Sequence, residues 1–426
     1  MRPLEAALRK ARWRLLPLLS ICYLVAYMDR ANISFAADTM SRDLGFTPKI
    51  YGLGAGLFFV SYALCEVPSN KLLLRFGARR WLARIMLTWG VLAAAMMFVH
   101  TSASFYGMRL LLGVAEAGYF PGVVYYLSQW FPPVERARAL SRFYVAFPLS
   151  SVVMGAVAGA LLRLNGRLHL HGWQWLFLVE GVPAVVLSVA LWKWLPDGPR
   201  EAAWLEIEER EALEAALHAG GMYLSHGSAE GALGRVLRDS RLWVLGTFYF
   251  FALGTSYALS FFLPSLLGAL TQWPAGQVGW LISLGGVVSA GAMLLFAVSS
   301  DRTGERRWHV AGAVLAMGGL LLAAGLHMEG SFAAAALLLT AVAYSAMQGP
   351  LLALATTLVP GVDGALFIAA FNTFGIIGGF VGPYWMGWMR ELTGGYAVGI
   401  GLLCVPCVVA GGCILWLTRE RSALQA

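Results

Sequence analysis

Four charged side chains stand out within the long apolar segments of this chain, and a charge within such a segment marks a candidate functional site by default. They are Asp29, Arg30, Arg109 and Glu116. Arg109 and Glu116 are seven residues apart, about two helical turns, so a helix places both on one face. Asp29 and Arg30 differ by about 100° around a helix, so at most one of them can point squarely into a central cavity.

These residue types suit the movement of a proton together with an anion. A buried carboxyl group can take up a proton on one side of a membrane and release it on the other. A guanidinium remains charged and offers a planar fork to a carboxylate. The alternative is that the four side chains neutralise one another as structural ion pairs, although buried ion pairs stabilise proteins poorly. The pattern therefore favours a proton-coupled anion carrier.

The composition places these residues in a membrane. Of the 426 residues, 59% are hydrophobic and 13% charged, with a mean hydropathy of +0.68. A soluble domain carries roughly twice that charged fraction. The net charge of +8 would suit nucleic acid in a soluble protein, but here the basic residues gather in alternate loops and indicate topology, so we expect no nucleic-acid partner. His169 and His171 share a loop without a third ligand, so we expect no metal site.

Twelve segments are long and apolar enough to cross a bilayer, which takes about 20 residues each. They are residues 15–37, 50–68, 82–99, 105–127, 142–163, 174–195, 242–264, 276–298, 309–327, 332–354, 364–389 and 396–417. The sequence predicts an all-α membrane protein in three parts, namely an N-terminal six-helix bundle (1–195), a cytoplasmic linker (196–241) and a C-terminal six-helix bundle (242–426).

Basic residues predict the orientation of these spans. The two termini, the linker and the connections on the same side hold 23 of the 31 Lys and Arg residues, and the opposite connections hold five. Both termini are therefore expected in the cytoplasm.

A short basic turn occurs twice, after the second span and after the eighth. The shared R-x-G-x-R-R pattern comprises Arg75, Gly77, Arg79 and Arg80 in the first copy, and Arg302, Gly304, Arg306 and Arg307, preceded by Asp301, in the second. The copies are 227 residues apart, about half the chain. Two parallel six-helix repeats predict such an offset.

These turns resemble the signature G-x-x-x-D-R-x-G-x-R-R of the major facilitator superfamily, which implies the twelve-helix fold of that family and a gating function for the turns. The second copy matches the signature closely. In the first copy, Ser69 stands where Gly is usual and Leu74 where the acid is usual. The first half therefore lacks the acid that normally helps to close the cytoplasmic side.

Four further segments resemble the anion:cation symporter family, especially its bacterial tartrate, hydroxyphenylacetate and sugar-acid permeases. They are M-D-R-A-N-I-S (28–34), V-P-S-N-K-L-L-L-R-F-G-A-R-R-W (67–81), G-V-A-E-A-G-Y-F-P-G (113–122) and F-N-T-F-G-I-I-G-G (371–379). The resemblance extends from about residue 14 to about residue 420.

The resemblance implies particular functions for the buried charges. Asp29 and Glu116 match proton-carrying acids, and Arg30 matches the arginine that faces the substrate carboxylate. Arg109 then becomes a charge partner that Glu116 releases or recaptures as it titrates. The residues that match positions able to bind substrate hydroxyls are Tyr62, Tyr257 and Asn372.

We therefore predict a monomeric symporter that imports a small organic anion with protons across a bacterial inner membrane by alternating access. The proton is the coupling ion and no other cofactor is expected. Tartrate-like diacids, aromatic carboxylates and sugar acids are all candidate substrates. The missing Gln near Pro148, frequent in sugar-acid members, argues against a long polyhydroxylated substrate.

Several alternatives stay open. Uniport or exchange of the anion would use the same fold, and drug efflux is disfavoured by two arginines near the cavity. A membrane-embedded enzyme needs a catalytic constellation near one membrane face, and none is recognised in the sequence, so we expect no enzymatic activity. A transporter-like sensor needs a signalling domain, for which the 46 residues between the halves are too few. Glu66 and Glu180 are expected nearer the membrane faces, paired or solvated. Gln348, before Gly349 and Pro350, marks either a kink or a point where the backbone meets the cavity.

Overall fold

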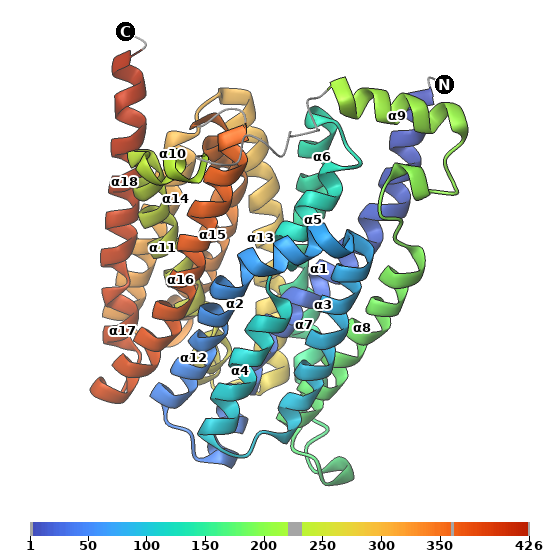
Figure 1. The fold of residues 1–426 in the computed structure, drawn as a ribbon. Coiled ribbons are helices and arrows are strands. Elements are labelled where there is room, and N and C mark those ends of the chain that lie inside the picture. Colours follow the sequence, from blue (N-terminus) through green and yellow to red (C-terminus); the bar gives the residue numbers. More distant parts are fainter. Residues whose placement is uncertain (1–2, 220–231, 359–361, 425–426) are drawn as a thin grey trace.

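The computed structural model describes residues 3–219, 232–358 and 362–424, which form helices and connecting turns without a strand among them (Figure 1). A bilayer offers no partner to backbone polar groups, so long apolar segments satisfy these groups within helices. The N-terminal half contains α1 (Pro3–Leu44), α2 (Pro48–Phe76), α3 (Ala78–Ala95), α4 (Ser102–Glu116), α5 (Tyr119–Ser128), α6 (Pro133–Tyr144), α7 (Ala146–Leu162) and α8 (Gly172–Trp194).

The C-terminal half repeats this arrangement of long helices. It contains α11 (Ser240–Ser260), α12 (Leu263–Thr271), α13 (Ala275–Thr303), α14 (Arg307–Leu326), α15 (Gly330–Leu358), α16 (Val362–Thr393), α17 (Ala397–Leu402) and α18 (Cys404–Leu424). Three short 3₁₀ helices lie at Met96–Phe98, Arg167–His169 and Pro199–Glu201.

Each of the twelve predicted spans coincides with one long helix or with two in succession. Ten helical segments within the described residues are long and apolar enough to cross a membrane. The other two spans are α1, whose middle carries the charges of Asp29 and Arg30, and α16. The predicted fold class, an all-α membrane protein built as two six-helix bundles, is confirmed.

Two helix pairs make the most extensive contacts between the halves, α2 with α16 and α7 with α13. Their closest approach lies in the parts of these helices furthest from the two chain termini (Figure 1). A Cβ added to Gly155 of α7 would collide with the carbonyl oxygen of Gly279 of α13, and the reverse also holds. Gly387 of α16 approaches the Pro48 carbonyl of α2 in the same way. The halves therefore touch at the end of the bundle opposite to the termini.

The linker contributes one helix to each half. α9 (Ile207–Ala219) packs against α1, and α10 (Ala232–Arg238) packs against α16. The Lys10 ammonium donates to the Glu209 carboxylate at 2.7 Å. This hydrogen bond lowers the pKa of Glu209 below its ordinary value. The predicted boundaries at residues 195 and 241 stay predictions.

Candidate functional site

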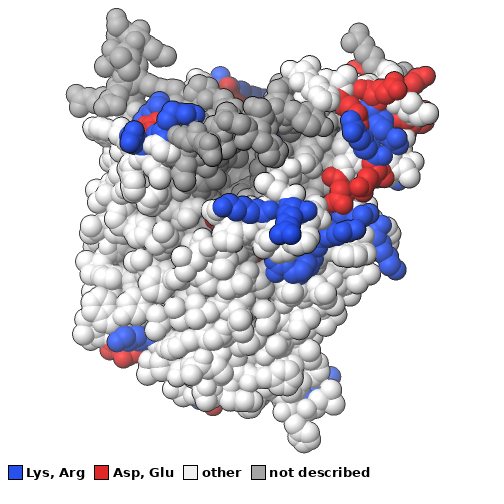
Figure 2. Space-filling view, in the orientation of Figure 1, with Lys and Arg blue, Asp and Glu red and all other residues white. Residues whose placement is uncertain are grey.

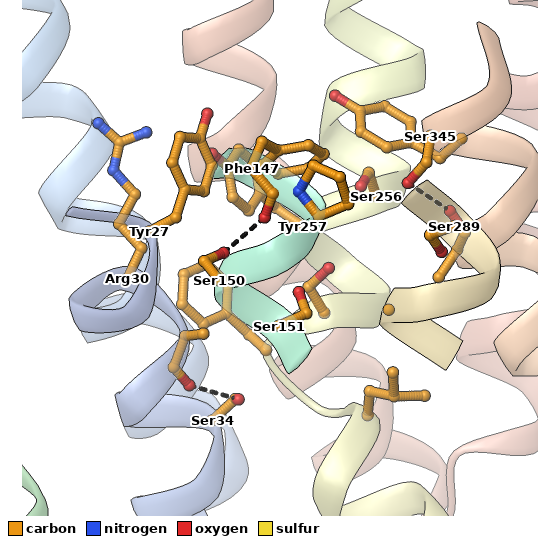
Figure 3. Close-up of a pocket in the computed structure, with 18 of the residues that line it drawn as sticks. Tyr27, Arg30, Ser34, Phe147, Ser150, Ser151, Ser256, Tyr257, Ser289 and Ser345 are labelled. Carbon is orange, nitrogen blue, oxygen red and sulfur yellow. Dashed lines mark hydrogen bonds between the residues drawn. The ribbon is translucent and has the colours of Figure 1, made fainter. Parts of the chain in front are cut away.

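A cavity of about 190 Å³ lies between the halves (Figure 3). Helices of both halves line it, including α1, α2 and α7 on one side and α11, α13 and α15 on the other. Among the described residues that line it, Arg30 is the one with a formal charge. Pockets for drug-sized ligands are commonly about 300–1,000 Å³. The cavity therefore suits a smaller ligand with a negative group directed to Arg30.

Arg30 is held by Glu116. The Arg30 Nε donates to Glu116 Oε1 at 2.7 Å, and a terminal guanidinium nitrogen forms an ion pair with the same oxygen. The Glu116 side chain is 1% exposed, whereas the Arg30 side chain is 15% exposed and lines the cavity. The second carboxylate oxygen of Glu116 has no hydrogen-bond partner within the described part of the chain. The acid thus lies behind the base, and the base faces the cavity.

Aromatic rings fix the position of the Arg30 guanidinium. Its central carbon lies 5.0 Å from the ring centroid of Tyr27, 5.1 Å from that of Tyr62 and 5.5 Å from that of Phe58. A cation over an aromatic face gains about 0.5–2 kcal/mol, depending on how far it is desolvated. These rings therefore stabilise the charged Arg30 side chain in the cavity wall even when Glu116 is no longer paired with it.

A break in the fourth span positions Glu116. It is the last residue of α4, and Gly118 follows with a φ of +86°, which favours glycine. A Cβ on Gly118 would collide with the Ser69 hydroxyl, and that hydroxyl donates to the Ala117 carbonyl at 2.6 Å. Ser69, one of the two residues that depart from the family signature, thus helps to hold the end of α4 and with it the carboxylate.

Asp29 faces away from the cavity. Its carboxylate accepts hydrogen bonds from Trp89 Nε1 of α3 at 2.7 Å and from Asn32 Nδ2 at 3.0 Å. The residue is 5% exposed. The expectation that only one of two neighbouring charges faces the cavity is confirmed, and that residue is Arg30.

Arg109 is occupied by backbone groups. Its Nε donates to the Gly54 carbonyl at 3.2 Å and a terminal nitrogen donates to the Ala55 carbonyl at 3.2 Å. It is 2% exposed, and its central carbon lies 4.9 Å from the ring centroid of Phe58. In this conformation Glu116 is therefore paired with Arg30 of another helix, not with Arg109 of its own helix.

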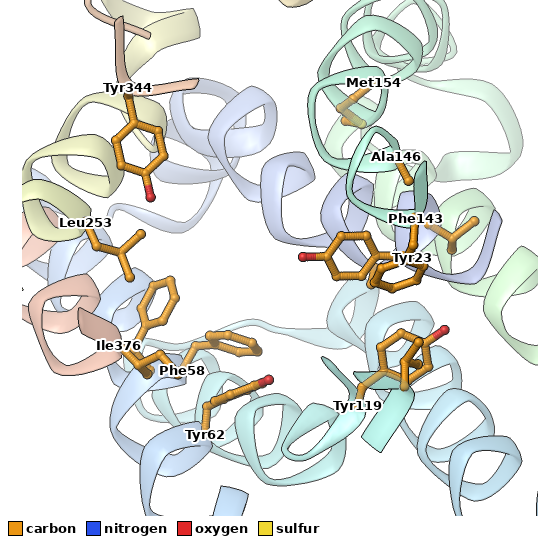
Figure 4. Packing of buried hydrophobic residues seen from close by; sticks show 14 of the residues in the cluster. Tyr23, Phe58, Tyr62, Tyr119, Phe143, Ala146, Met154, Leu253, Tyr344 and Ile376 are labelled. Atoms are coloured by element: carbon orange, nitrogen blue, oxygen red, sulfur yellow. The ribbon is translucent and has the colours of Figure 1, made fainter. Parts of the chain in front are cut away.

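The three side chains predicted to bind hydroxyls all line the cavity. Tyr257 lies opposite Arg30 in Figure 3, and Figure 4 shows Tyr62 directed toward the space between the halves. Asn372 reaches the cavity from α16. The structure thus brings Arg30, Tyr62, Tyr257 and Asn372 to one cavity, with Glu116 directly behind it.

Sequence reasoning named Gln348 only for its backbone and missed its side chain, together with the serines that line the cavity. Gln348 lines the cavity, is 8% exposed, and its amide nitrogen lacks a partner within the described residues. The hydroxyls of Ser34, Ser150 and Ser345 also line it and donate to carbonyls of their own helices. Each such hydroxyl keeps lone pairs that can accept from a ligand. A lone Gln in an apolar span was the available signal, whereas single serines gave none.

Glu66 and Glu180 are both buried within the helix bundle. Glu66 is 6% exposed and accepts a hydrogen bond from the Thr373 hydroxyl of α16 at 3.3 Å, across the two halves. Glu180 of α8 is 4% exposed, and neither carboxylate oxygen has a hydrogen-bond partner within the described residues. The expectation that Glu180 is paired or solvated is therefore wrong.

The two basic turns lie at the end of the bundle that carries the termini (Figure 1). Gly77, with a φ of +85°, joins α2 to α3, and Gly304, with a φ of +68°, joins α13 to α14. In the first turn the Arg79 backbone N–H donates to Asp197 Oδ1 at 2.7 Å, and the guanidinium lies 3.6 Å from the same carboxylate. Asp197, which follows α8, therefore supplies an acid to the turn whose own acid position is occupied by Leu74.

The second turn makes a different contact. The Arg306 guanidinium donates to the Ala353 carbonyl of α15 at 3.0 Å. One further arginine of each turn makes a cation–π contact. The central guanidinium carbon of Arg75 lies 5.6 Å from the Phe76 ring centroid, and that of Arg307 lies 5.6 Å from the Trp308 ring centroid. The gating function of all nine residues of the two turns, Arg80, Asp301 and Arg302 included, stays a prediction.

Comparisons with known proteins agree with this architecture. The chain is 42% identical to a protein of Agrobacterium vitis whose name provisionally assigns it to tartrate transport, over 94% of this chain and 93% of that one. It is 35% identical to the inner membrane transport protein RhmT of Escherichia coli, over 99% and 97% of the two chains.

Solved structures share the fold. A bacterial homologue of the human lysosomal transporter Spinster superimposes with a TM-score of 0.77 at 17% identity, covering 96% of this chain and 97% of that chain. The xylose transporter XylE of Escherichia coli gives a TM-score of 0.72 at 15% identity, covering 94% and 97%.

The family comparison covers most of the chain. The model of the Major Facilitator Superfamily matches residues 19–383 and again residues 245–425. With twelve spans in two bundles around a central cavity, the chain is a membrane transport protein and belongs to the Major Facilitator Superfamily.

Proposed function

We propose that this protein is a symporter that carries a small organic anion together with a proton. The observation that carries the proposal is the pair of Arg30 and Glu116 in the cavity wall. While Glu116 is ionised, it forms an ion pair with the Arg30 guanidinium, which a substrate carboxylate would need for its own binding. Protonation of Glu116 removes its charge, so Arg30 becomes free for the anion. Proton and anion then bind together, and each is released when the other leaves.

The cavity supports an organic acid as the substrate class. An arginine binds a carboxylate through two parallel hydrogen bonds, which a compact ammonium group cannot do. Tyr62, Tyr257 and Asn372 supply further hydrogen-bonding groups around Arg30, and aromatic rings supply much of the remaining wall. This combination suits a small carboxylate with hydroxyl groups or an aromatic ring, including tartrate, hydroxyphenylacetate and short sugar acids.

We also propose that the protein resides in the bacterial inner membrane as a monomer with both termini in the cytoplasm. The uneven distribution of Lys and Arg supports this orientation. In Figure 2 the charged side chains gather mainly toward the end of the molecule that carries the termini, and a broad white face separates them from the few at the other end. One similar protein, RhmT, is named an inner membrane transport protein.

Uptake into proteoliposomes tests the proposal. Labelled mono- and dicarboxylates are offered with an inward proton gradient, without a gradient, and with an ionophore that dissipates it. We expect accumulation above the external concentration only with the gradient. Equal, downhill uptake in all conditions would indicate uniport, and uptake that depends on an internal anion would indicate exchange. Either result would overturn proton symport.

A further inference from the structure

A second group of buried acids lies behind α1, on the side away from the cavity. Glu180 projects from α8, and both oxygens of its carboxyl group are buried without a hydrogen-bond partner within the described residues. α8 packs against α1, which carries Asp29 and Asn32, and against α3, whose Trp89 donates to Asp29. Of these side chains, only Asp29 can titrate.

Close packing of α3 and α8 shapes this site. A Cβ on Gly181 would lie 2.6 Å from the Gly90 carbonyl oxygen, and a Cβ on Gly90 would lie 2.9 Å from the Gly181 carbonyl oxygen. The residues next to these glycines in sequence are Glu180 and Trp89. The glycine contact thus brings together the helices that carry the Trp89 indole, which donates to Asp29, and the Glu180 carboxyl group.

The hydrogen bonds distinguish the two acids. Asp29 accepts from two donors, Trp89 and Asn32, as an ionised carboxylate requires. Glu180 accepts from none. A buried carboxylate without a cation or a donor is very costly, and the usual outcome is that the group binds a proton. A protonated Glu180 gains an O–H donor, for which the oxygens of Asp29 and Asn32 are acceptors.

The balance of charges agrees with this assignment. Around α1 and α4, Asp29 and Glu116 are balanced by Arg30 and Arg109, so an ionised Glu180 would add a third negative charge without a third cation. We propose that Glu180 is a protonated, neutral acid beside an ionised Asp29, and that these two carboxyl groups hold one proton between them in a site separate from the Arg30–Glu116 pair. The N-terminal half then binds a proton that never contacts the substrate.

Infrared spectroscopy of the purified full-length protein in lipid nanodiscs tests the proposal without any substrate. The wild-type protein at neutral pH should show the C=O band of a protonated carboxyl group, with the downshift in D₂O that such a group gives. Glu180→Gln should lose this band, and Glu116→Gln, the matched control, should keep it because Glu116 is ion-paired. A band unchanged by Glu180→Gln would show that Glu180 is ionised and would overturn the proposal.

A second measurement tests whether the two acids share the proton. Asp29→Asn removes the neighbouring negative charge, so the Glu180 band should disappear at a lower pH than in the wild type. Asp29→Glu keeps a negative charge and should titrate close to the wild type. Identical titration of Asp29→Asn and the wild type would mean that the two acids are independent, which contradicts a shared site.

Thermal unfolding tests the neutral state of Glu180 through stability, so a variant that folds poorly still gives an informative result. Gln has the size of a protonated Glu and no charge, so Glu180→Gln should unfold within a few degrees of the wild type, whereas Glu180→Lys should unfold far earlier. A large loss of stability in Glu180→Gln would indicate that the charge is required and would overturn the proposal. Because these readouts need no transport, the proton site and the symport proposal can fail separately.

Discussion

The Glu116 carboxylate at the end of α4 pairs with the Arg30 guanidinium of α1, while Arg109, two turns away on the same helix as Glu116, binds carbonyl groups of α2. The two arginines therefore differ in what they can do. Arg30 can exchange one carboxylate for another at the cavity wall. Arg109 stabilises the packing of α4 on α2 through its hydrogen bonds to Gly54 and Ala55.

Arg30→Lys should weaken anion binding by about tenfold or more, the loss expected when one charge-assisted hydrogen bond of a bidentate pair is removed. Lysine keeps the charge but lacks the planar fork. Isothermal titration of the purified variant with the transported anion measures the effect. The exposed Arg302→Lys is the control, and it should bind like the wild type. Unchanged affinity in Arg30→Lys would exclude Arg30 as the carboxylate ligand.

Glu116→Gln should abolish accumulation against a concentration gradient but retain counterflow, which requires no net proton movement. Glutamine resembles the protonated acid, so Arg30 stays available to the anion while the titration is lost. Asp29→Asn should act similarly, or more severely if Asp29 also orients Arg30. Proteoliposome uptake at several pH values checks both variants. Wild-type accumulation with wild-type pH dependence in both would favour a purely structural function for these ion pairs.

Arg109→Lys should reduce the stability of the protein, because one ammonium group cannot reproduce two hydrogen bonds directed to Gly54 and Ala55. The loss of one hydrogen bond from a charged donor costs about 1.5–3 kcal/mol. Thermal unfolding of the variant measures this effect, and the pH dependence of its remaining uptake shows whether Arg109 also takes part in coupling. An altered pH profile with unchanged stability would assign Arg109 to coupling with Glu116 instead.

Contact between α9 and α1 should weaken in acid. The hydrogen bond from Lys10 lowers the pKa of Glu209. The ionised carboxylate therefore stabilises the contact fully at a pH above the ordinary pKa of Glu, and this stabilisation is lost as the pH falls through the lowered pKa of Glu209. Spin labels at the exposed positions Glu5 and Glu211 should give a narrow distance distribution near pH 7 and a broad one once the pH falls below the lowered pKa of Glu209. Lys10→Met should broaden the distribution at neutral pH. A distribution that is narrow at both pH values would mean that other contacts hold α9.

The spans and the divergence of Asp29 from Arg30 could be predicted from local sequence patterns, whereas the choice of Arg30 as the cavity cation came from the family resemblance. Apolar runs of span length identify the helices, and the neighbouring Asp29 and Arg30 must diverge around α1. The partner of Glu116 could not be predicted, since sequence spacing shows that Arg109 shares its helix face but not that α1 brings Arg30 closer.

The prediction that Glu180 is paired or solvated failed for a related reason. Its position in the sixth span suggested proximity to a membrane face, and water or a cation was the natural partner to expect. The burial of Glu180 depends on how closely α3 and α8 approach, which is decided by Gly90 and Gly181 from segments about 90 residues apart. Single glycines in apolar spans are too common to indicate such a contact.

The glycine contact between Gly155 and Gly279 has a consequence for the transport cycle. Besides the glycine backbones, the contact holds the Ser283 hydroxyl of α13, which donates to the Val152 carbonyl of α7 at 2.7 Å, so the two helices can slide or separate there without first unlocking large side chains. A single methyl group at either position would act as a wedge that forces the outer ends of α7 and α13 apart. The equilibrium between the two orientations of the cavity is therefore sensitive to the smallest change in side-chain size at two glycines that do not themselves line the cavity.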